Sequence, residues 1–359
     1  MRIETISGIP EKAATLMIPG KGVRQINWFL TRECAHRCGG CRVWAREINP
    51  MDDPEREGVL DNLRRISKRG AFMSIMVNDL TRDFELARRT VEDAAERGFF
   101  VAMVVEGSGV SEEKIEILKA AGLSYLNISI DAMHGNNHRG ERLLNLLAYA
   151  RSRGIVPVVN SMIERETIKD QESRARFLEF ADRVLKNSLF FNPIVCSPAL
   201  APQIGDLSNA SPERVPLQRD LQPVLNWLIN KKNETGRIAS GRIGLDEVLE
   251  LGITDAGEIR LWKCADNFRS LLRPGRGHLT LDSDGYVGPC SERPHVVNLV
   301  NYQGTLTLSG LNEQFLPVID QCPGCLYLCL MTEEGTVGFF NALKEVRSGL
   351  EIAKVLSIR

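Results

Sequence analysis

The segment Thr31-Arg32-Glu33-Cys34-Ala35-His36-Arg37-Cys38-Gly39-Gly40-Cys41 directly follows the first strand that the sequence predicts, Gln25–Leu30. Its cysteines have the spacing C-x3-C-x2-C. Cysteine thiolates are the usual ligands of iron–sulfur clusters, so three of them on one short loop can hold three irons of a [4Fe–4S] cluster. The fourth iron then has no protein ligand and can bind a small molecule. We therefore expect Cys34, Cys38 and Cys41 to form an iron–sulfur site.

Two alternatives for this segment stay open. The three cysteines could mark one buried face of a helix, but the adjacent Gly39 and Gly40 disfavour a helix by about 1 kcal/mol each. The loop could also bind zinc with His36 as the fourth ligand. Structural zinc sites, however, prefer cysteine pairs spaced C-x2-C. The spacing and the position after a strand favour the iron–sulfur interpretation.

On both sides of this loop, short apolar runs alternate with longer helical patterns through the first 200 residues, which predicts βα units and a parallel sheet. The expected strands are Gln25–Leu30, Phe72–Val77, Phe99–Val105, Tyr125–Ile130, Val156–Ser161 and Leu189–Val195. The expected helices are Asp53–Arg69, Asp83–Arg97, Ser111–Ala121, Glu141–Arg153 and Asp170–Lys186, and glycines end four of them, at Gly70, Gly98, Gly122 and Gly154. Six units are fewer than the eight of a closed barrel. Periodicity alone allows either a partial barrel or an open doubly wound sheet.

The rhythm of the chain changes after the sixth expected strand. The stretch 196–216 is rich in Pro, Ser and Ala and predicts a loop, which a helix follows at Leu217–Lys232. From Gly236 the expected strands are short and separated by turns such as Asp282-Ser283-Asp284-Gly285. A last amphipathic helix is expected over Gly335–Ser348.

The second half of the chain carries its own group of cysteines. The chain has nine cysteines, an odd number, and they are clustered, which favours metal binding over a disulfide set. Five of them are Cys264, Cys290, Cys322, Cys325 and Cys329. Five thiolates exceed the four that one closed cluster or one zinc ion needs. The remaining cysteine, Cys196, stands alone at a strand end, where we expect a small buried residue.

Together, the cysteine loop, its place after the first strand and the six βα units resemble the radical S-adenosylmethionine (radical SAM) superfamily over about residues 20–200. The resemblance implies a partial (β/α)6 TIM-type barrel. It also implies that the open iron chelates S-adenosylmethionine and that one electron, from a donor such as flavodoxin or ferredoxin, cleaves the sulfonium. The product is a 5′-deoxyadenosyl radical that abstracts hydrogen from a substrate C–H bond.

The same resemblance assigns cofactor-binding residues to the ends of strands. The family usually carries Gly-Gly-Glu after its second strand, whereas this chain reads Val77-Asn78-Asp79, so Asp79 takes the place of the glutamate beside the methionyl amino group. Ser129, in a segment similar to the family's Ser-x-Asp, is placed near the methionyl carboxylate. Arg139 and Asn160 are further candidates. Ordinary turn chemistry is the alternative for each of them, because Asn and Asp are common at strand ends.

Two positions depart from the family's pattern. An aromatic residue usually precedes the third cysteine, where this chain has Gly40, and asparagine often follows the first cysteine, where this chain has Ala35. The contacts to adenine are therefore left open.

The C-terminal cysteines resemble an auxiliary-cluster domain of the SPASM or twitch type. In the shorter, twitch form, Cys264, Cys290, Cys322 and Cys325 would hold one auxiliary [4Fe–4S] cluster. Cys329 is the expected spare, although it could replace Cys322, and a structural zinc site is the alternative. The resulting domains are an N-terminal extension at 1–20, the radical SAM barrel at 21–215 and the auxiliary domain at 216–359.

The composition limits the partners. The net charge of −1 and the lack of any run of about 20 apolar residues give no reason to expect nucleic acid or a membrane. No signal peptide is recognised, so we expect a cytoplasmic protein. Because only 33 residues precede Cys34, we expect no leader-binding domain and favour a small-molecule substrate.

The resulting prediction is an oxidoreductase that abstracts hydrogen, with a catalytic base that the sequence does not identify. The alternatives are a maturase that cross-links or otherwise modifies a ribosomal peptide or protein, an iron–sulfur electron carrier, and a zinc-stabilised binding module.

Overall fold

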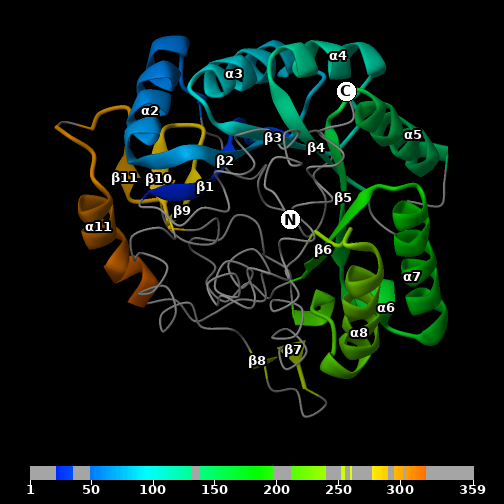
Figure 1. Cartoon of the computed structure of the whole chain (residues 1–359). Helices are drawn as coiled ribbons and strands as arrows, with labels where there is room; N and C mark the ends of the chain where they lie inside the picture. Colours follow the sequence, from blue (N-terminus) through cyan, green and yellow to red (C-terminus); the bar gives the residue numbers. More distant parts are fainter. Residues whose placement is uncertain are drawn as a thin grey trace, which may run out of the picture.

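The computed structural model describes residues 22–34, 49–130, 138–196, 212–239, 252–254, 259–260, 277–289, 295–302 and 304–320. Their largest feature is a nine-stranded sheet with the order β11-β10-β9-β1-β2-β3-β4-β5-β6 (Figure 1). Its strands are β1 Val23–Phe29, β2 Ser67–Val77, β3 Phe100–Val105, β4 Leu123–Ser129, β5 Val156–Ile163, β6 Phe190–Val195, β9 Gly277–Leu281, β10 Tyr286–Gly288 and β11 Val297–Asn298. A separate pair joins β7 Gly252–Ile253 to β8 Ile259–Arg260.

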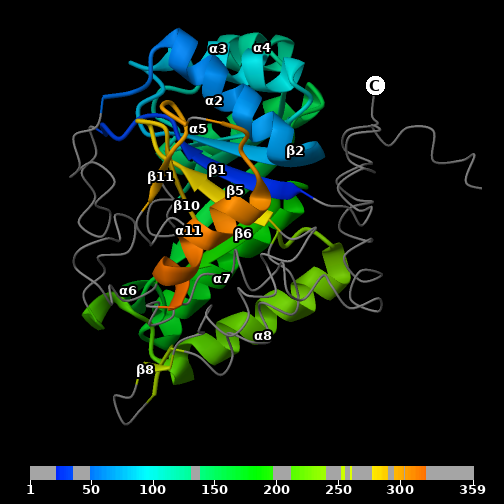
Figure 2. The same cartoon turned by 90° about the vertical axis from the view of Figure 1, so that its left-hand side faces the viewer.

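The strands from β1 to β6 are parallel, and each pairs with the next along the chain. These six strands therefore lack the reversal of strand order that defines a doubly wound sheet. It curves without closing, and helices lie along its outer side (Figures 1 and 2). The predicted partial barrel of six βα units is confirmed, and the doubly wound alternative is wrong.

Polar side chains cap the beginnings of several helices. The described helices are α2 Asp53–Ile66, α3 Phe84–Glu96, α4 Glu112–Ala120, α5 His138–Ser152, α6 Arg165–Ile168, α7 Gln171–Lys186, α8 Gln218–Thr235 and α11 Leu308–Asp320, with a short 3₁₀ turn at Pro212–Arg214. At α2 a capping box forms, because Asp52 accepts from the Glu55 amide at 2.9 Å and Glu55 accepts from the Asp52 amide at 3.0 Å. Asp170 caps α7 in the same way through the Ser173 amide, at 2.8 Å.

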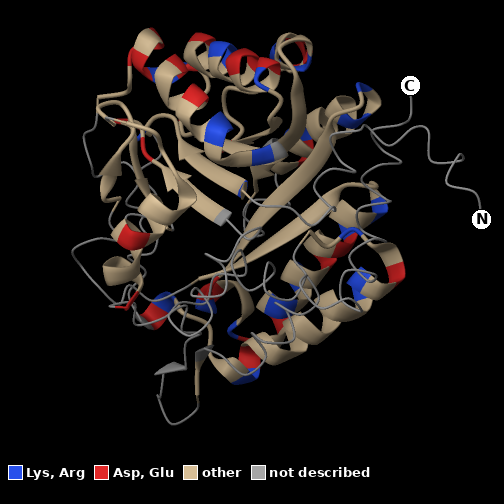
Figure 3. Cartoon of the chain, turned by 60° about the vertical axis from the view of Figure 1, so that its left-hand side comes forward, with Lys and Arg blue, Asp and Glu red and all other residues tan. Residues whose placement is uncertain are grey.

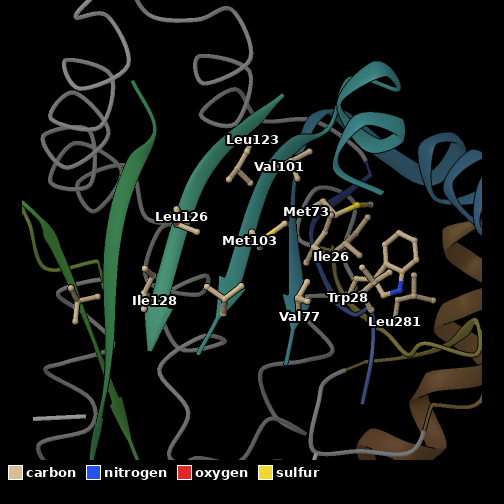
Figure 4. Packing of buried hydrophobic residues seen from close by; sticks show 14 of the residues in the cluster. Ile26, Trp28, Met73, Val77, Val101, Met103, Leu123, Leu126, Ile128 and Leu281 are labelled. Atoms are coloured by element: carbon tan, nitrogen blue, oxygen red, sulfur yellow. The ribbon is translucent and has the colours of Figure 1, made fainter. Parts of the chain in front are cut away.

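One continuous apolar layer joins the outer side of the sheet to these helices. Alternate strand residues such as Ile26, Met73, Met103, Leu126 and Ile128 are fully buried in it (Figure 4). Leucines, valines and phenylalanines of α2, α3, α5 and α7 pack on them from outside. Charged residues are found mainly in the helices (Figure 3). Period-two alternation in the strands and helical periodicity between them thus produce a single core.

The inner side of the sheet is formed by the intervening residues and is chemically different. Some of its apolar members form a small second cluster of Val156, Val158 and Phe190, against which Tyr125 packs. Tyr125 also makes edge-on contacts with Phe72 and Phe100, with ring centroids 5.4 and 5.1 Å apart. Polar side chains occupy much of the rest of this side, and they matter for the site.

The first expected helix was predicted too long. It was expected over Asp53–Arg69, but α2 ends at Ile66, because Ser67 adopts extended backbone angles and starts β2. Gly70 has a positive φ of 73°, as expected of a helix-ending glycine, but it lies inside β2. The register between β1 and β2 shifts there, from Val23↔Ser67 to Gln25↔Phe72. Gly98, Gly122 and Gly154, with φ of 83°, 105° and 74°, do follow helices as predicted.

The second half of the chain joins the same sheet. β9 pairs with β1 in parallel, and β10 and β11 continue the sheet antiparallel. Leu311, Phe315 and Ile319 of α11 are buried in the same core. The helix expected at 335–348 lies outside the described residues, and the domain boundary at 215 stays a prediction. Within the described ranges, no helix is long and apolar enough to cross a membrane.

Candidate functional site

The cysteine loop begins at the carboxyl end of the central strand β1. Cys34 lies there as a free, half-buried thiol. The carboxyl ends of parallel barrel strands are where loops gather to form sites. Cys38 and Cys41 lie outside the described residues, as do all five C-terminal cysteines predicted as ligands. The part of the chain that is described accordingly contains no group of three metal-binding side chains.

Asn78 at the end of β2 holds the start of this loop. Its Nδ2 donates to the carbonyl oxygen of Thr31 at 2.9 Å, and the Leu30 amide donates to the Met76 carbonyl at 3.0 Å. In the segment Val77-Asn78-Asp79, the sequence pattern pointed to the carboxylate of Asp79 as the candidate contact. The amide beside it is what connects the second strand to the loop.

Asp79 takes part in the turn that leads to α3. Its Oδ1 accepts from the amides of Thr81 and Arg82, at 3.1 and 3.2 Å. This is the turn chemistry that the sequence left as the alternative. A contact between Asp79 and the cofactor stays a prediction.

Ser129 and Asn160 are brought together at the ends of β4 and β5. They are paired in register, and the Ile130 amide donates to the Asn160 carbonyl at 2.9 Å. Ser129 is exposed and Asn160 is buried. Asn192 on β6, which the sequence did not select, donates from Nδ2 to Asn160 Oδ1 at 2.9 Å. Arg139 lies in the first turn of α5, and its side chain is not among the described ones.

Further polar side chains follow the inner side of the sheet from one strand to the next. Asn27 on β1 pairs in register with Ser74 on β2 and with Thr280 on β9. Its Nδ2 lies 3.5 Å from Nε2 of His278, a buried side chain. Burial lowers the pKa of His278 to about 4, so this imidazole is neutral at pH 7. Alternation of polar residues within otherwise apolar strands, as in Gln25-Ile26-Asn27, was the available signal for these residues.

Several buried polar atoms at this end have no hydrogen-bond partner among the described residues, and Thr31 Oγ1 and Asn127 Oδ1 are two of them. Buried polar groups are normally satisfied, so such atoms indicate a missing polar partner. Thr31 precedes Cys34 by three residues, and Asn127 lies one inward position before Ser129 on β4. Together with a half-exposed thiol at the end of β1, these atoms fit a cluster that presents a polar small molecule to the strand ends.

A buried ion pair stands directly before Cys34. Arg32 donates from Nε to Asp282 Oδ1 at 2.8 Å and from Nη2 to Oδ2 at 2.7 Å, with both side chains at most 2% exposed. The Arg32 guanidinium also lies 4.6 Å from the Phe29 ring centroid, and His295 Nδ1 lies 3.5 Å from Asp282 Oδ2. Burial alone would raise the pKa of Asp282, but His295 and Arg32 hold it well below its ordinary value. Asp282 is thus ionised and paired at neutral pH.

Cys196 is separate from this arrangement. It is buried at the end of β6, and burial raises the pKa of its thiol to about 12. A thiol that stays protonated is a poor metal ligand. The prediction of a small buried residue is confirmed.

A partial parallel barrel with a cysteine loop after its first strand agrees with the resemblance to radical SAM enzymes that the sequence shows. Residues 28–178 match the sequence profile of the Radical SAM superfamily. Over these residues, which are less than half of the chain, the sequence is similar to that superfamily of enzymes.

Individual known proteins are similar to this chain in sequence or in structure. Fe-coproporphyrin III synthase of Methanosarcina barkeri is 25% identical over 154 residues, which are 40% of this chain and 38% of that protein. The chain therefore spans well under half the length of that relative. Streptococcus suis SuiB bound to its precursor peptide SuiA has a similar structure, with a TM-score of 0.57, 15% identity, and coverage of 90% of this chain and 73% of that one.

A second solved structure is native anSMEcpe with bound AdoMet and the Cp18Cys peptide. Its TM-score is 0.57 at 13% identity, and the similarity covers 92% of this chain and 96% of that one. At these identities the likeness defines the fold. It agrees with the open barrel described above.

Proposed function

We propose that this protein is a radical SAM oxidoreductase that reductively cleaves S-adenosylmethionine and abstracts hydrogen from a substrate C–H bond. The observation that carries the proposal is Cys34, a free thiol at the carboxyl end of β1, in a C-x3-C-x2-C loop within the part of the chain that matches the superfamily. An electron carrier has no use for an iron without a protein ligand.

In this proposal Cys34, Cys38 and Cys41 hold the first cluster. When bound, such a cluster supplies one electron to the sulfonium of S-adenosylmethionine, which releases methionine and a 5′-deoxyadenosyl radical. The chain's own residues orient the methionyl group. Ser129 and Asn160, which lie on adjacent strand ends, would contact it, and Asn192 donates to the Asn160 amide oxygen. Asp79 and Arg139 are the other candidate contacts.

We also propose that Cys264, Cys290, Cys322 and Cys325 hold a single auxiliary [4Fe–4S] cluster in a domain spanning 216–359, with Cys329 spare. That cluster would assist oxidation or binding of the substrate. An external flavodoxin or ferredoxin would supply the electrons in the cytoplasm.

Two substrate classes are compatible with the site. A small molecule is the class that the sequence favours. A peptide is the second candidate, because two structural neighbours hold peptides, SuiA in SuiB and Cp18Cys in anSMEcpe. The asparagine amides on the inner side of the sheet can donate to and accept from either class.

The test compares Cys34→Ala with Cys196→Ala in protein reconstituted and reduced under anaerobic conditions with S-adenosylmethionine. We expect the wild type to contain about eight irons per chain, as two four-iron clusters, and to release 5′-deoxyadenosine. Cys34→Ala should lose about four irons and reduce nucleoside to background, whereas Cys196→Ala should keep both. Full iron and undiminished nucleoside in Cys34→Ala would refute the proposal.

A further inference from the structure

The turn Asp282-Ser283-Asp284-Gly285, between β9 and β10, contacts the chain on both sides of the cysteine loop. On the upstream side Asp282 forms the two-pronged ion pair with Arg32. On the downstream side the Met51 amide donates to the Ser283 carbonyl at 2.8 Å. The contact at the upstream end joins residues that are 250 positions apart in the chain.

The turn has little freedom to move. Gly285 has a φ of 83°, a backbone angle that residues with a side chain rarely adopt. A Cβ there would overlap Val300 and lie 3.2 Å from the Met51 sulfur. The Leu299 amide donates to the Gly285 carbonyl at 2.8 Å, and the Asp282 amide donates to the Tyr286 carbonyl at 2.8 Å. The turn is therefore a rigid support for whatever it contacts.

The ion pair is suited to positioning. Replacing a buried pair by apolar groups of similar volume is often neutral or stabilising, so burial of Arg32 and Asp282 at 2% and 1% exposure is weak evidence for a role in stability. A bidentate fork, in contrast, fixes both the distance and the plane of the guanidinium. With Phe29 beneath it, Arg32 is held in one orientation two residues before Cys34.

We propose that the Asp282–Gly285 turn braces both ends of the cysteine loop, and that Arg32 and Asp282 are positioning residues for cleavage of S-adenosylmethionine. The brace also ties the loop to the segment that leads from β10 to Cys290, a predicted auxiliary ligand. The part that concerns cleavage rests on the proposed function. The part that concerns the loop can be tested without any cluster.

The first experiment measures the alkylation rate of Cys34 by iodoacetamide in the full-length chain without iron. We compare wild type with Asp282→Asn and with the apolar pair Arg32→Met/Asp282→Leu, which removes the fork without leaving a buried charge. Asp93→Asn is the matched control, because Asp93 pairs at 2.9 Å with Arg56, also 2% exposed, but between α2 and α3. Buried Cys196 reports global unfolding within every sample.

The expected result is alkylation of Cys34 about tenfold faster in both brace variants, equivalent to about 1.4 kcal/mol of lost restraint. Cys196 should stay protected, and Asp93→Asn should leave Cys34 unchanged. If Asp282→Asn also makes Cys196 react, that variant has unfolded. The alkylation rate of Cys34 in the apolar pair then decides whether the brace exists. Wild-type rates at Cys34 in the apolar pair would overturn the brace.

The second experiment titrates S-adenosylmethionine into the reduced, reconstituted proteins and follows the change in the electron paramagnetic resonance signal of the first cluster. The apolar pair should contain as much iron as wild type and need about tenfold more cofactor, again about 1.4 kcal/mol, for the same spectral change. A wild-type titration in that variant would show that the pair does not position the cofactor. Failure of the wild type itself to bind a cluster would refute the proposed function, while the alkylation result would still decide the brace.

Discussion

Leu126 and Asn127 are neighbours on β4, yet they belong to two different environments. Leu126 points outward into the main core and is fully buried. Asn127 points inward, is half-buried, and keeps a buried amide oxygen without a partner among the described residues. The same contrast repeats along β1, β2 and β9. One side of the sheet is filled for stability, and the other keeps polar groups that the fold itself does not need.

The largest effect that this contrast predicts is on stability at the outer side. Leu126→Ala should lower the free energy of unfolding by about 2–5 kcal/mol, because it leaves a cavity between β4 and the helices. Urea unfolding measures the change. A cost no greater than that of Asn127→Ala would contradict the division into two sides.

A pH effect should be intermediate. His278 has a folded-state pKa of about 4 against an ordinary value of 6.5. The unfolded chain takes up a proton below about pH 6.5 and the folded chain does not, so stability should be constant above that pH and fall between pH 6.5 and 4. The loss is roughly 3 kcal/mol, at about 1.4 kcal/mol for each unit of pKa.

Urea unfolding of wild type and His278→Gln over pH 4–8 checks this effect, because the difference between the two proteins removes the contribution of carboxylates that titrate in the same range. The wild type should lose stability relative to the variant as the pH falls. Parallel curves would mean that the pKa of His278 is the same in the folded and the unfolded protein.

The smallest effect on stability should come from the inner side. Asn127→Ala removes an amide whose oxygen has no partner among the described residues, so the free energy of unfolding should change by less than about 1 kcal/mol. The same variant should raise the S-adenosylmethionine or substrate concentration needed for half-maximal nucleoside formation. Unchanged kinetics together with a large loss of stability would mean that Asn127 stabilises the fold and has no part in binding cofactor or substrate.

The outer side of the sheet could be predicted from the sequence better than the inner side. Strands β2 to β6 contain apolar runs that turns and helical patterns interrupt, so most expected strands match the observed ones within two residues. The end of α2 was missed because Lys68, Arg69 and Gly70 have the pattern of a helix terminus, whereas pairing with β1 draws Ser67 into extended structure. Local pattern carries no information about that partner.

The candidate site was predictable only in part. Cys34 and Ser129 were selected because a known spacing and a family motif point to them, and Asn160 was selected from its place at a strand end. Their contacts with a cluster or cofactor stay predictions. Asn27, Asn78, Asn127 and Asn192 were missed because single amides in apolar strands have no motif. The pairing of Arg32 with Asp282 depends on two segments 250 residues apart, and only the folded chain brings them together.

The pairing of β1 with β9 also sets the order of events during synthesis. Chains emerge from the ribosome amino-terminus first. β1 can pair with β2 once about 77 residues have been made, but its other edge has to wait for residues 277–281. Until then that edge displays unpaired amides and carbonyls beside the cysteine loop, and such an edge invites pairing with other chains. The nascent protein is therefore most vulnerable to aggregation, and its cysteine loop least supported, during the long interval in which the barrel is already translated and β9 is not.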